Sequence, residues 1–220
     1  MQEPDAGPLS DDQVQALHDR ANDLTSASAA RSLYHDWAPV YDATIGRFGR
    51  YLSPDRIAAE AARWCPDRSV RVLDVACGTG LAGAALARQG FSHITGLDLS
   101  EEMLAVAAAK GCYERLLAAD LSGPLPFDAG AFGVITCIGA LLAGHLDRAA
   151  FLRMVHLLPP GGVLVADVEG GTFEDEGYAA ALERLQRAGV LAEVVQEAGH
   201  FHAPGPEEEM HGWFVVVRRG

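Results

Sequence analysis

The sequence predicts an α/β fold in which a mostly parallel β-sheet is covered by helices on both faces. Three observations lead to this prediction. Between residues 70 and 168, short apolar runs alternate with helical patterns, as they do in parallel sheets whose strands are joined by helices. A glycine-rich turn follows the first of these runs. The 220 residues, 49% of them apolar, suffice for one sizeable core but hardly for two ordinary domains.

Residues 1–30 are predicted to form a polar N-terminal segment with one short helix. Ser10 and Gln13 have capping-box spacing, and Val14 and Leu17 begin the apolar face of that helix. The stretch 26–30 fits either a turn or a continuation of the helix. The rest of the chain, 31–220, is predicted to be one domain that opens with helices over 31–64.

The alternating part predicts five strands, over residues 70–75, 93–97, 113–119, 132–138 and 163–168. Helices are predicted between them, over residues 81–88, 100–110 and 147–158. The remainder, 172–220, predicts one helix over 179–188 and two extended segments, 191–201 and 213–218. A polar loop that contains Pro204 and Glu207 separates these segments, so we expect a terminal antiparallel pair.

Composition disfavours several classes of function. Seventeen Lys and Arg against 30 Asp and Glu leave a net charge of −13, and no basic patch is evident, so nucleic acid is a disfavoured partner. No apolar run approaches the roughly 18 residues of a membrane span, and residues 1–5 lack signal-peptide features. We therefore expect a cytoplasmic protein with no membrane partner. The four scattered cysteines predict neither disulfides nor a zinc site.

Three successive strands of the predicted sheet end in a carboxylate, namely Asp74, Asp98 and Asp120. Ligands of open α/β sheets bind beyond the carboxyl ends of the strands. Gly78 and Gly80 in the first turn let a ligand approach the backbone. The spacing Gly78–Gly83 also matches the dinucleotide fingerprint, with Asp98 about 20 residues on. The three carboxylates would, however, repel the negatively charged diphosphate of a dinucleotide.

S-adenosylmethionine suits these residues better, because it carries a sulfonium and an ammonium cation and no phosphate. Asp98 is expected to accept hydrogen bonds from the ribose hydroxyls and Asp120 from the adenine amine. Asp74 is expected to support the methionine end through its charge or through water. A dinucleotide-dependent oxidoreductase and a non-catalytic S-adenosylmethionine-binding interaction protein remain the alternatives.

The segment Asp74–Gly80 resembles the first motif of class I S-adenosylmethionine-dependent methyltransferases. Gly96–Leu104 is similar to their second motif, Pro126–Ile138 to the approach to their fourth strand, and Leu158–Gly162 to the turn before their fifth. The resemblance spans roughly residues 30 to 190 in the expected order. Tyr34–Asp42 and Ala180–Gly189 are, within this class, most similar to the Williams–Beuren-region methyltransferase-like proteins.

The resemblance implies a Rossmann-like sheet of seven strands with the last strand inserted antiparallel, and S-adenosylmethionine as the cofactor. It makes the helices over 31–64 a lid over the cofactor. Ala76 departs from the pattern, because many members have glycine there, and so does Gly133. The predicted cofactor contacts are Tyr34, Trp37, Tyr41, Asp74, Ala76, Gly78, Gly80, Asp98, Leu99, Met103, Asp120, Leu121 and Ile138.

The predicted reaction is methyl transfer to a small-molecule acceptor held in line with the methyl–sulfur bond, which is catalysis mainly by orientation. His145 follows the fourth strand and is a candidate base, although a surface histidine at a helix entry fits equally well. His200, His202 and His211 lack a carboxylate or cysteine at ligand spacing, so no metal is predicted. Nothing in the sequence predicts an oligomeric state.

Overall fold

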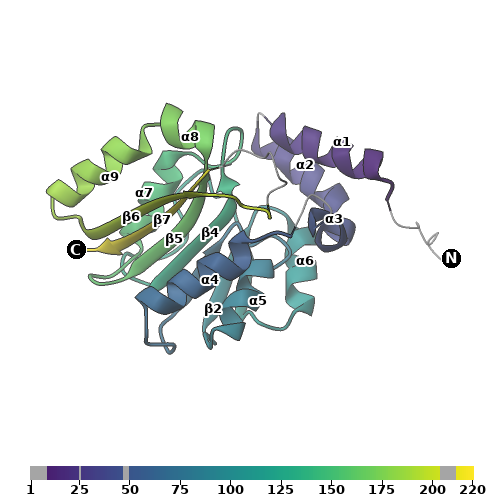
Figure 1. Ribbon diagram of the computed structural model, residues 1–220. Coiled ribbons are helices and arrows are strands. Elements are labelled where there is room, and N and C mark those ends of the chain that lie inside the picture. Colours follow the sequence, from purple (N-terminus) through teal and green to yellow (C-terminus); the bar gives the residue numbers. More distant parts are fainter. Residues whose placement is uncertain (1–8, 25, 47–49, 204–211) are drawn as a thin grey trace.

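The protein folds around a single seven-stranded sheet of strand order β3-β2-β1-β4-β5-β7-β6, which confirms the predicted architecture (Figure 1). A computed structural model describes residues 9–24, 26–46, 50–203 and 212–220. Its strands are β1 (Val72–Val75), β2 (Ile94–Asp98), β3 (Arg115–Ala118), β4 (Val134–Leu141), β5 (Val163–Glu169), β6 (Leu191–Gly199) and β7 (Gly212–Arg219).

The first five strands are parallel, and β7 lies antiparallel between β5 and β6. Every residue of β1 and β2 is buried, as expected for parallel strands covered on both faces. The predicted fourth strand begins two residues later than expected, at Val134, where the pairing with Val72 of β1 and Val163 of β5 starts. The polar loop with Pro204 and Glu207 lies outside the described residues.

Helices cover both faces of the sheet (Figure 1). One face carries α4 (Ser53–Trp64), α5 (Leu81–Arg88) and α6 (Glu101–Ala109). The other carries α7 (Arg148–His156) and α9 (Tyr178–Arg187). The two apolar layers alternate along each strand: Val163 and Val165 pack towards α4, whereas Leu164 and Ala166 pack towards α7. The period of two residues thus divides each buried strand between two cores.

The N-terminal helices gather beyond the carboxyl edge of the sheet, at the upper right of Figure 1. They are α1 (Asp11–Asn22), α2 (Ala27–Trp37), the 3₁₀ turn η1 (Ala38–Val40) and α3 (Tyr41–Ile45). Ser10 forms the predicted capping box of α1. Ser26 caps a new helix, so the stretch 26–30 is neither a turn nor a continuation of α1. Helix α2 therefore crosses the boundary predicted at residues 30 and 31.

A small apolar core holds the N-terminal helices together. Leu24, Ala30, Leu33 and Trp37 are buried against one another. The indole Nε1 of Trp37 donates to Thr44 Oγ1 over 2.8 Å, which ties α2 to α3. These helices form a unit with its own packing, placed over the sheet edge.

The chain after β5 holds one helix more than predicted. Helix α8 (Gly170–Asp175) starts directly at the strand end, because both carboxylate oxygens of Glu169 accept backbone N–H groups, from Gly171 and Thr172. Phe173 of α8 stacks on Trp213 of β7, with ring centroids 4.6 Å apart. Within the described residues, none of the helices has the length and apolar character needed to cross a membrane.

Candidate cofactor site

The turn after β1 has the backbone conformation that its glycines allow. Gly78 and Gly80 have φ of 52° and 88°, in the left-handed region. A Cβ at position 78 would have no heavy atom of another residue within 4 Å, leaving space for a ligand beside the backbone. Ala76 also has a positive φ, 55°, and this conformation costs an L-residue about 1–2 kcal/mol. The departure from glycine noted in the sequence is therefore a strained position.

Asp98, the last residue of β2, is held in place by two backbone N–H groups. Its Oδ2 accepts from Gly78 N over 2.8 Å, and its Oδ1 accepts from Ser100 N over 2.9 Å. Burial raises the pKa of Asp98, while these hydrogen bonds from Ser100 and Gly78 oppose the rise. An ionised carboxylate offers about four acceptor sites. Each oxygen therefore keeps capacity for a further donor, such as one hydroxyl of a diol.

Asp120 follows β3 and is exposed at the neighbouring strand end. Both the N–H and the hydroxyl of Ser122 donate to its Oδ1. These bonds hold the pKa of Asp120 below its usual range. The carboxylate thus stays ionised and oriented by its own turn.

A cavity of about 390 Å³, here called the glycine-turn cavity, opens at this edge of the sheet. Its volume lies in the range of small-molecule sites. The structure brings together most of the predicted contacts in its lining: Tyr34, Tyr41, Ala76, Gly78, Asp98, Leu99, Met103, Asp120, Leu121 and Ile138, together with the candidate base His145. The sequence reasoning missed seven further lining residues: Ser26, Ala30, Ser122, Gly139, Ala140, Gly144 and Leu146.

Three predicted contacts lie outside the lining of this cavity. Trp37 is 2% exposed and belongs to the small N-terminal core. Gly80 is covered by Tyr113, whose Cε2 would lie 2.9 Å from an added Cβ. Asp74 is 1% exposed, because it lies within β1 and not after it, and its oxygens accept from the hydroxyls of Tyr113 and Thr136. Burial raises the pKa of Asp74 to about 6.

Tyr113 also occupies the place where a dinucleotide would need free backbone amides. Its hydroxyl accepts from Gly83 N over 3.2 Å, and its ring fills the space beside Gly80 and Gly83. Asp42 of α3 accepts from Thr79 Oγ1 and from Lys110 Nζ, over 2.5 and 2.6 Å. The N-terminal end of α5 is therefore covered by a ring and a carboxylate, a poor setting for a diphosphate.

Tyr34 and His145 meet where the glycine-turn cavity continues into a second one. The Tyr34 hydroxyl lies 2.9 Å from His145 Nε2, and His145 Nδ1 lies 3.3 Å from Ala143 O. Because the carbonyl only accepts, Nδ1 carries the proton and Nε2 accepts from Tyr34. Burial lowers the pKa of His145 and so favours this neutral form.

The second cavity, here called the adjoining cavity, measures about 400 Å³. It shares five lining residues with the first: Tyr34, Tyr41, Gly139, Ala140 and His145. It lies between the carboxyl ends of β4 and β5 and the N-terminal helices. Tyr51 and Asp167, which the sequence reasoning did not single out, line it. The sequence could have indicated Asp167, because it is the one carboxylate inside the apolar run 163–168. The position of Tyr51 depends on tertiary packing, so no local pattern predicts it.

His200 and His202 do not form part of a metal site within the described residues, where no group of three or more His, Cys, Asp or Glu could hold an ion. His202 instead stacks on Tyr51, with ring centroids 4.8 Å apart. His211 lies outside the described residues.

A family model and curated relatives indicate a methyltransferase. A family model described as a methyltransferase domain matches residues 72–162. Methyltransferase-like protein 27 of Homo sapiens is 32% identical over 202 residues, covering 89% of this chain and 80% of the human protein. The ubiquinone biosynthesis O-methyltransferase of Xylella fastidiosa (strain 9a5c) is 40% identical over 126 residues, covering 51% of this chain and 47% of that protein.

Solved structures share the fold. The complex of DhpI with S-adenosylhomocysteine has a TM-score of 0.60 and is 22% identical, covering 88% of this chain and 97% of DhpI. A similarity at this level of identity shows that the fold is shared. It does not show that the two proteins act on the same substrate.

Proposed function

Because the chain belongs to the class I S-adenosylmethionine-dependent methyltransferases, in the family of methyltransferase-like protein 27, we propose that its glycine-turn cavity binds S-adenosylmethionine and its adjoining cavity a small-molecule acceptor. The observation that carries the proposal is Asp98, buried yet held by two backbone amides with acceptor capacity left on each oxygen. That arrangement fits the two hydroxyls of a ribose.

The remaining lining residues each contact a different part of the cofactor. Asp120 accepts a hydrogen bond from the adenine amine, and Met103 and Leu99 make apolar contacts with the base. Gly78 lets the ligand approach the backbone. Tyr34 and Tyr41 of the N-terminal helices cover the methionine end and exclude water from it. Asp74 acts indirectly, because it anchors Tyr113 under the turn and so supports the position of Gly78 and Gly80.

S-adenosylmethionine supplies an activated methyl group on a sulfonium, so the chain chiefly has to hold an acceptor lone pair in line with it. The adjoining cavity meets the glycine-turn cavity at Gly139, and Tyr34 and His145 lie at that junction. When the acceptor must lose a proton, two transfers occur together. The acceptor gives its proton to the Tyr34 oxygen, and the Tyr34 hydroxyl proton passes to His145 Nε2. The neutral His145 is ready to accept it.

A small molecule is the proposed acceptor because the adjoining cavity holds about 400 Å³ and the net charge of −13 opposes binding of nucleic acid. Among the relatives, the Xylella protein is an O-methyltransferase of ubiquinone biosynthesis by its name. A small-molecule acceptor is in keeping with that relative.

Isothermal titration of S-adenosylhomocysteine into the wild type and Asp98→Ala tests the cofactor site. We expect micromolar binding to the wild type and a loss of about tenfold to a hundredfold in Asp98→Ala, because two ribose hydrogen bonds to a charged group disappear. Asp128→Ala, which removes an exposed carboxylate before β4, is the matched control and should bind normally. Binding of NAD in place of S-adenosylhomocysteine would contradict the proposal.

A further inference from the structure

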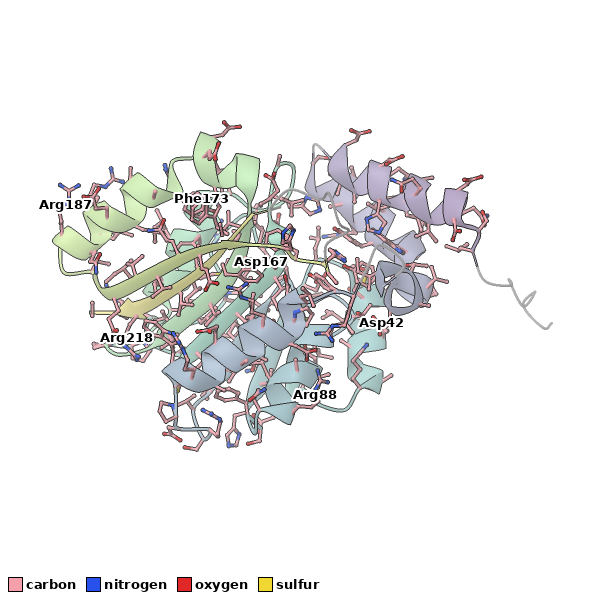
Figure 2. All side chains as sticks on the ribbon, in the orientation of Figure 1. Asp42, Arg88, Asp167, Phe173, Arg187 and Arg218 are labelled. Atoms are coloured by element: carbon pink, nitrogen blue, oxygen red, sulfur yellow. The ribbon has the colours of Figure 1, made fainter. Side chains whose placement is uncertain are left out.

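Asp167 lies on the floor of the adjoining cavity without a cationic partner in the described part of the chain. It is 1% exposed. Its Oδ1 accepts from Gly139 N over 2.7 Å, while its Oδ2 makes no hydrogen bond within the described residues. The buried hydroxyl of Ser53 approaches the carboxylate but is outside hydrogen-bond geometry. Figure 2 shows Asp167 on the sheet, on the side of the N-terminal helices that carry Asp42.

The surroundings of Asp167 do not compensate its charge. Burial raises its pKa to about 6, which leaves the carboxylate ionised at pH 7.5. Tyr41 and Tyr51 lie close enough for the charge to raise the pKa of their own hydroxyls, after burial itself. Neither phenol supplies a positive charge. A buried carboxylate without a cation is an unfavourable arrangement that a bound cation relieves.

The rest of the adjoining cavity favours a cation as well. Its described lining contains a second carboxylate, Glu169, and neither Lys nor Arg. The lining holds three histidines, His18, His145 and His202. Burial lowers the pKa of His18, and the charge of His202 lowers it further, while burial lowers the pKa of His145, so His18 and His145 are neutral near pH 7. Several walls are aromatic, and the faces of such rings attract ammonium groups.

From these observations, and resting on the proposed function, we propose that the methyl acceptor carries a positively charged amine and that Asp167 is the residue that selects it. The Oδ2 atom is enclosed by the cavity floor, so Asp167 acts on the amine through its charge. In a cavity walled by protein, that attraction is far less screened than in water. Anionic analogues are excluded for the same reason.

Three probes of nearly equal shape test the proposal: tryptamine, tryptophol and indole-3-acetate, which differ in the charge at the end of the side chain. Binding of each is measured at pH 7.5 by titration calorimetry, with and without saturating S-adenosylhomocysteine. For the wild type we expect tryptamine to bind at least about tenfold more tightly than tryptophol, and indole-3-acetate not to bind.

Asp167→Asn keeps the acceptor for Gly139 N and removes the charge. We expect it to bind tryptamine and tryptophol within about a factor of three of each other, while S-adenosylhomocysteine binds as in the wild type. Asp128→Asn removes one exposed charge in the loop before β4 and should keep the preference for the amine. A merely structural role of Asp167 would weaken both probes alike.

Equal binding of amine and alcohol by the wild type, or no binding of tryptamine at millimolar concentration, would overturn the inference even if Asp167→Asn failed to fold. An unchanged preference in a folded Asp167→Asn would do so too. Loss of S-adenosylhomocysteine binding with a retained amine preference would instead overturn the proposed cofactor site and leave the role of Asp167 standing.

Discussion

Two buried carboxylates, Asp74 and Asp167, each titrate near pH 6 in the folded protein. In an unfolded chain an aspartate titrates near pH 3.9. The folded state therefore binds more protons between about pH 4 and pH 6, and stability falls as the pH rises through that window. Asp74 is compensated in part by two hydroxyl donors. Asp167 has a single donor within hydrogen-bond geometry in the described residues.

Asp167→Asn is expected to be more stable than the wild type at pH 7.5, by about 1–3 kcal/mol, because the amide removes a buried uncompensated charge. At pH 4.5 the folded wild type already holds the proton whereas most unfolded chains do not, so the difference should shrink to less than about 1 kcal/mol. Urea unfolding followed by circular dichroism at both pH values measures the difference. An equal destabilisation at both pH values would show that Asp167 serves packing and not charge.

The position of one strand end also decides which of the predicted carboxylates line the glycine-turn cavity. Asp98 is the last residue of β2 and reaches the cavity. Asp74 was grouped with it, although the predicted strand already ran to residue 75; within β1 its side chain is buried in the interior. A difference of one residue changes the surroundings of a side chain in a strand. Asp167 was overlooked because an apolar run was interpreted as core alone.

Among the elements, the N-terminal helices depend on few contacts of their own. Their core consists of four buried residues, and their remaining attachments include the bond from Trp37 to Thr44 and the Asp42 link to Lys110 and Thr79. Such units open at lower free energy than the sheet. We infer that bound cofactor stabilises them, because they supply Tyr34 and Tyr41 to its cavity.

Leu33→Ala, in the middle of α2, tests this dependence. Leu33 is 1% exposed, and Leu→Ala in such a position costs about 2–5 kcal/mol of local stability. We expect amide hydrogen exchange in α1 and α2 to become faster, exchange in β1 and β4 to stay unchanged, and affinity for S-adenosylhomocysteine to fall several-fold. The exposed Ser32→Ala is the control on the same helix. Faster exchange in the sheet as well would show that the helices are not a separate unit.

The alternating elements were predictable because their signals are local. Apolar runs, N-caps such as Ser100 and Asp147, and glycine turns lie within a few residues of the elements they define, and the structure contains these caps. Helix α8 was missed because its cap is Glu169, the final residue of a strand. The arrangement of the N-terminal helices over the sheet edge depends on contacts between distant segments, for which the sequence offers no local signal.

For the molecule as a whole, the net charge of −13 acts on any charged ligand. S-adenosylmethionine carries a net positive charge, whereas S-adenosylhomocysteine is neutral overall. A surplus of negative charge attracts the cation over distances comparable to the Debye length, and salt screens the attraction.

Raising NaCl from about 50 to 500 mM is therefore expected to weaken binding of S-adenosylmethionine several-fold, while binding of S-adenosylhomocysteine changes less than twofold. Titration calorimetry at three salt concentrations gives both slopes. Parallel slopes for the two ligands would mean that local contacts alone determine the affinity.

The place of β7 has a consequence for how the chain reaches its final form. This strand follows both β5 and β6 in the sequence, yet it pairs with each of them, over 7 and 8 residue positions. Until it has left the ribosome, β5 keeps an open edge and β6 has no sheet to join. Strand β7 therefore completes the sheet by joining β6 to β5. A nascent chain stalled before residue 212 would expose the unpaired edge of β5, which chaperones and aggregating partners recognise.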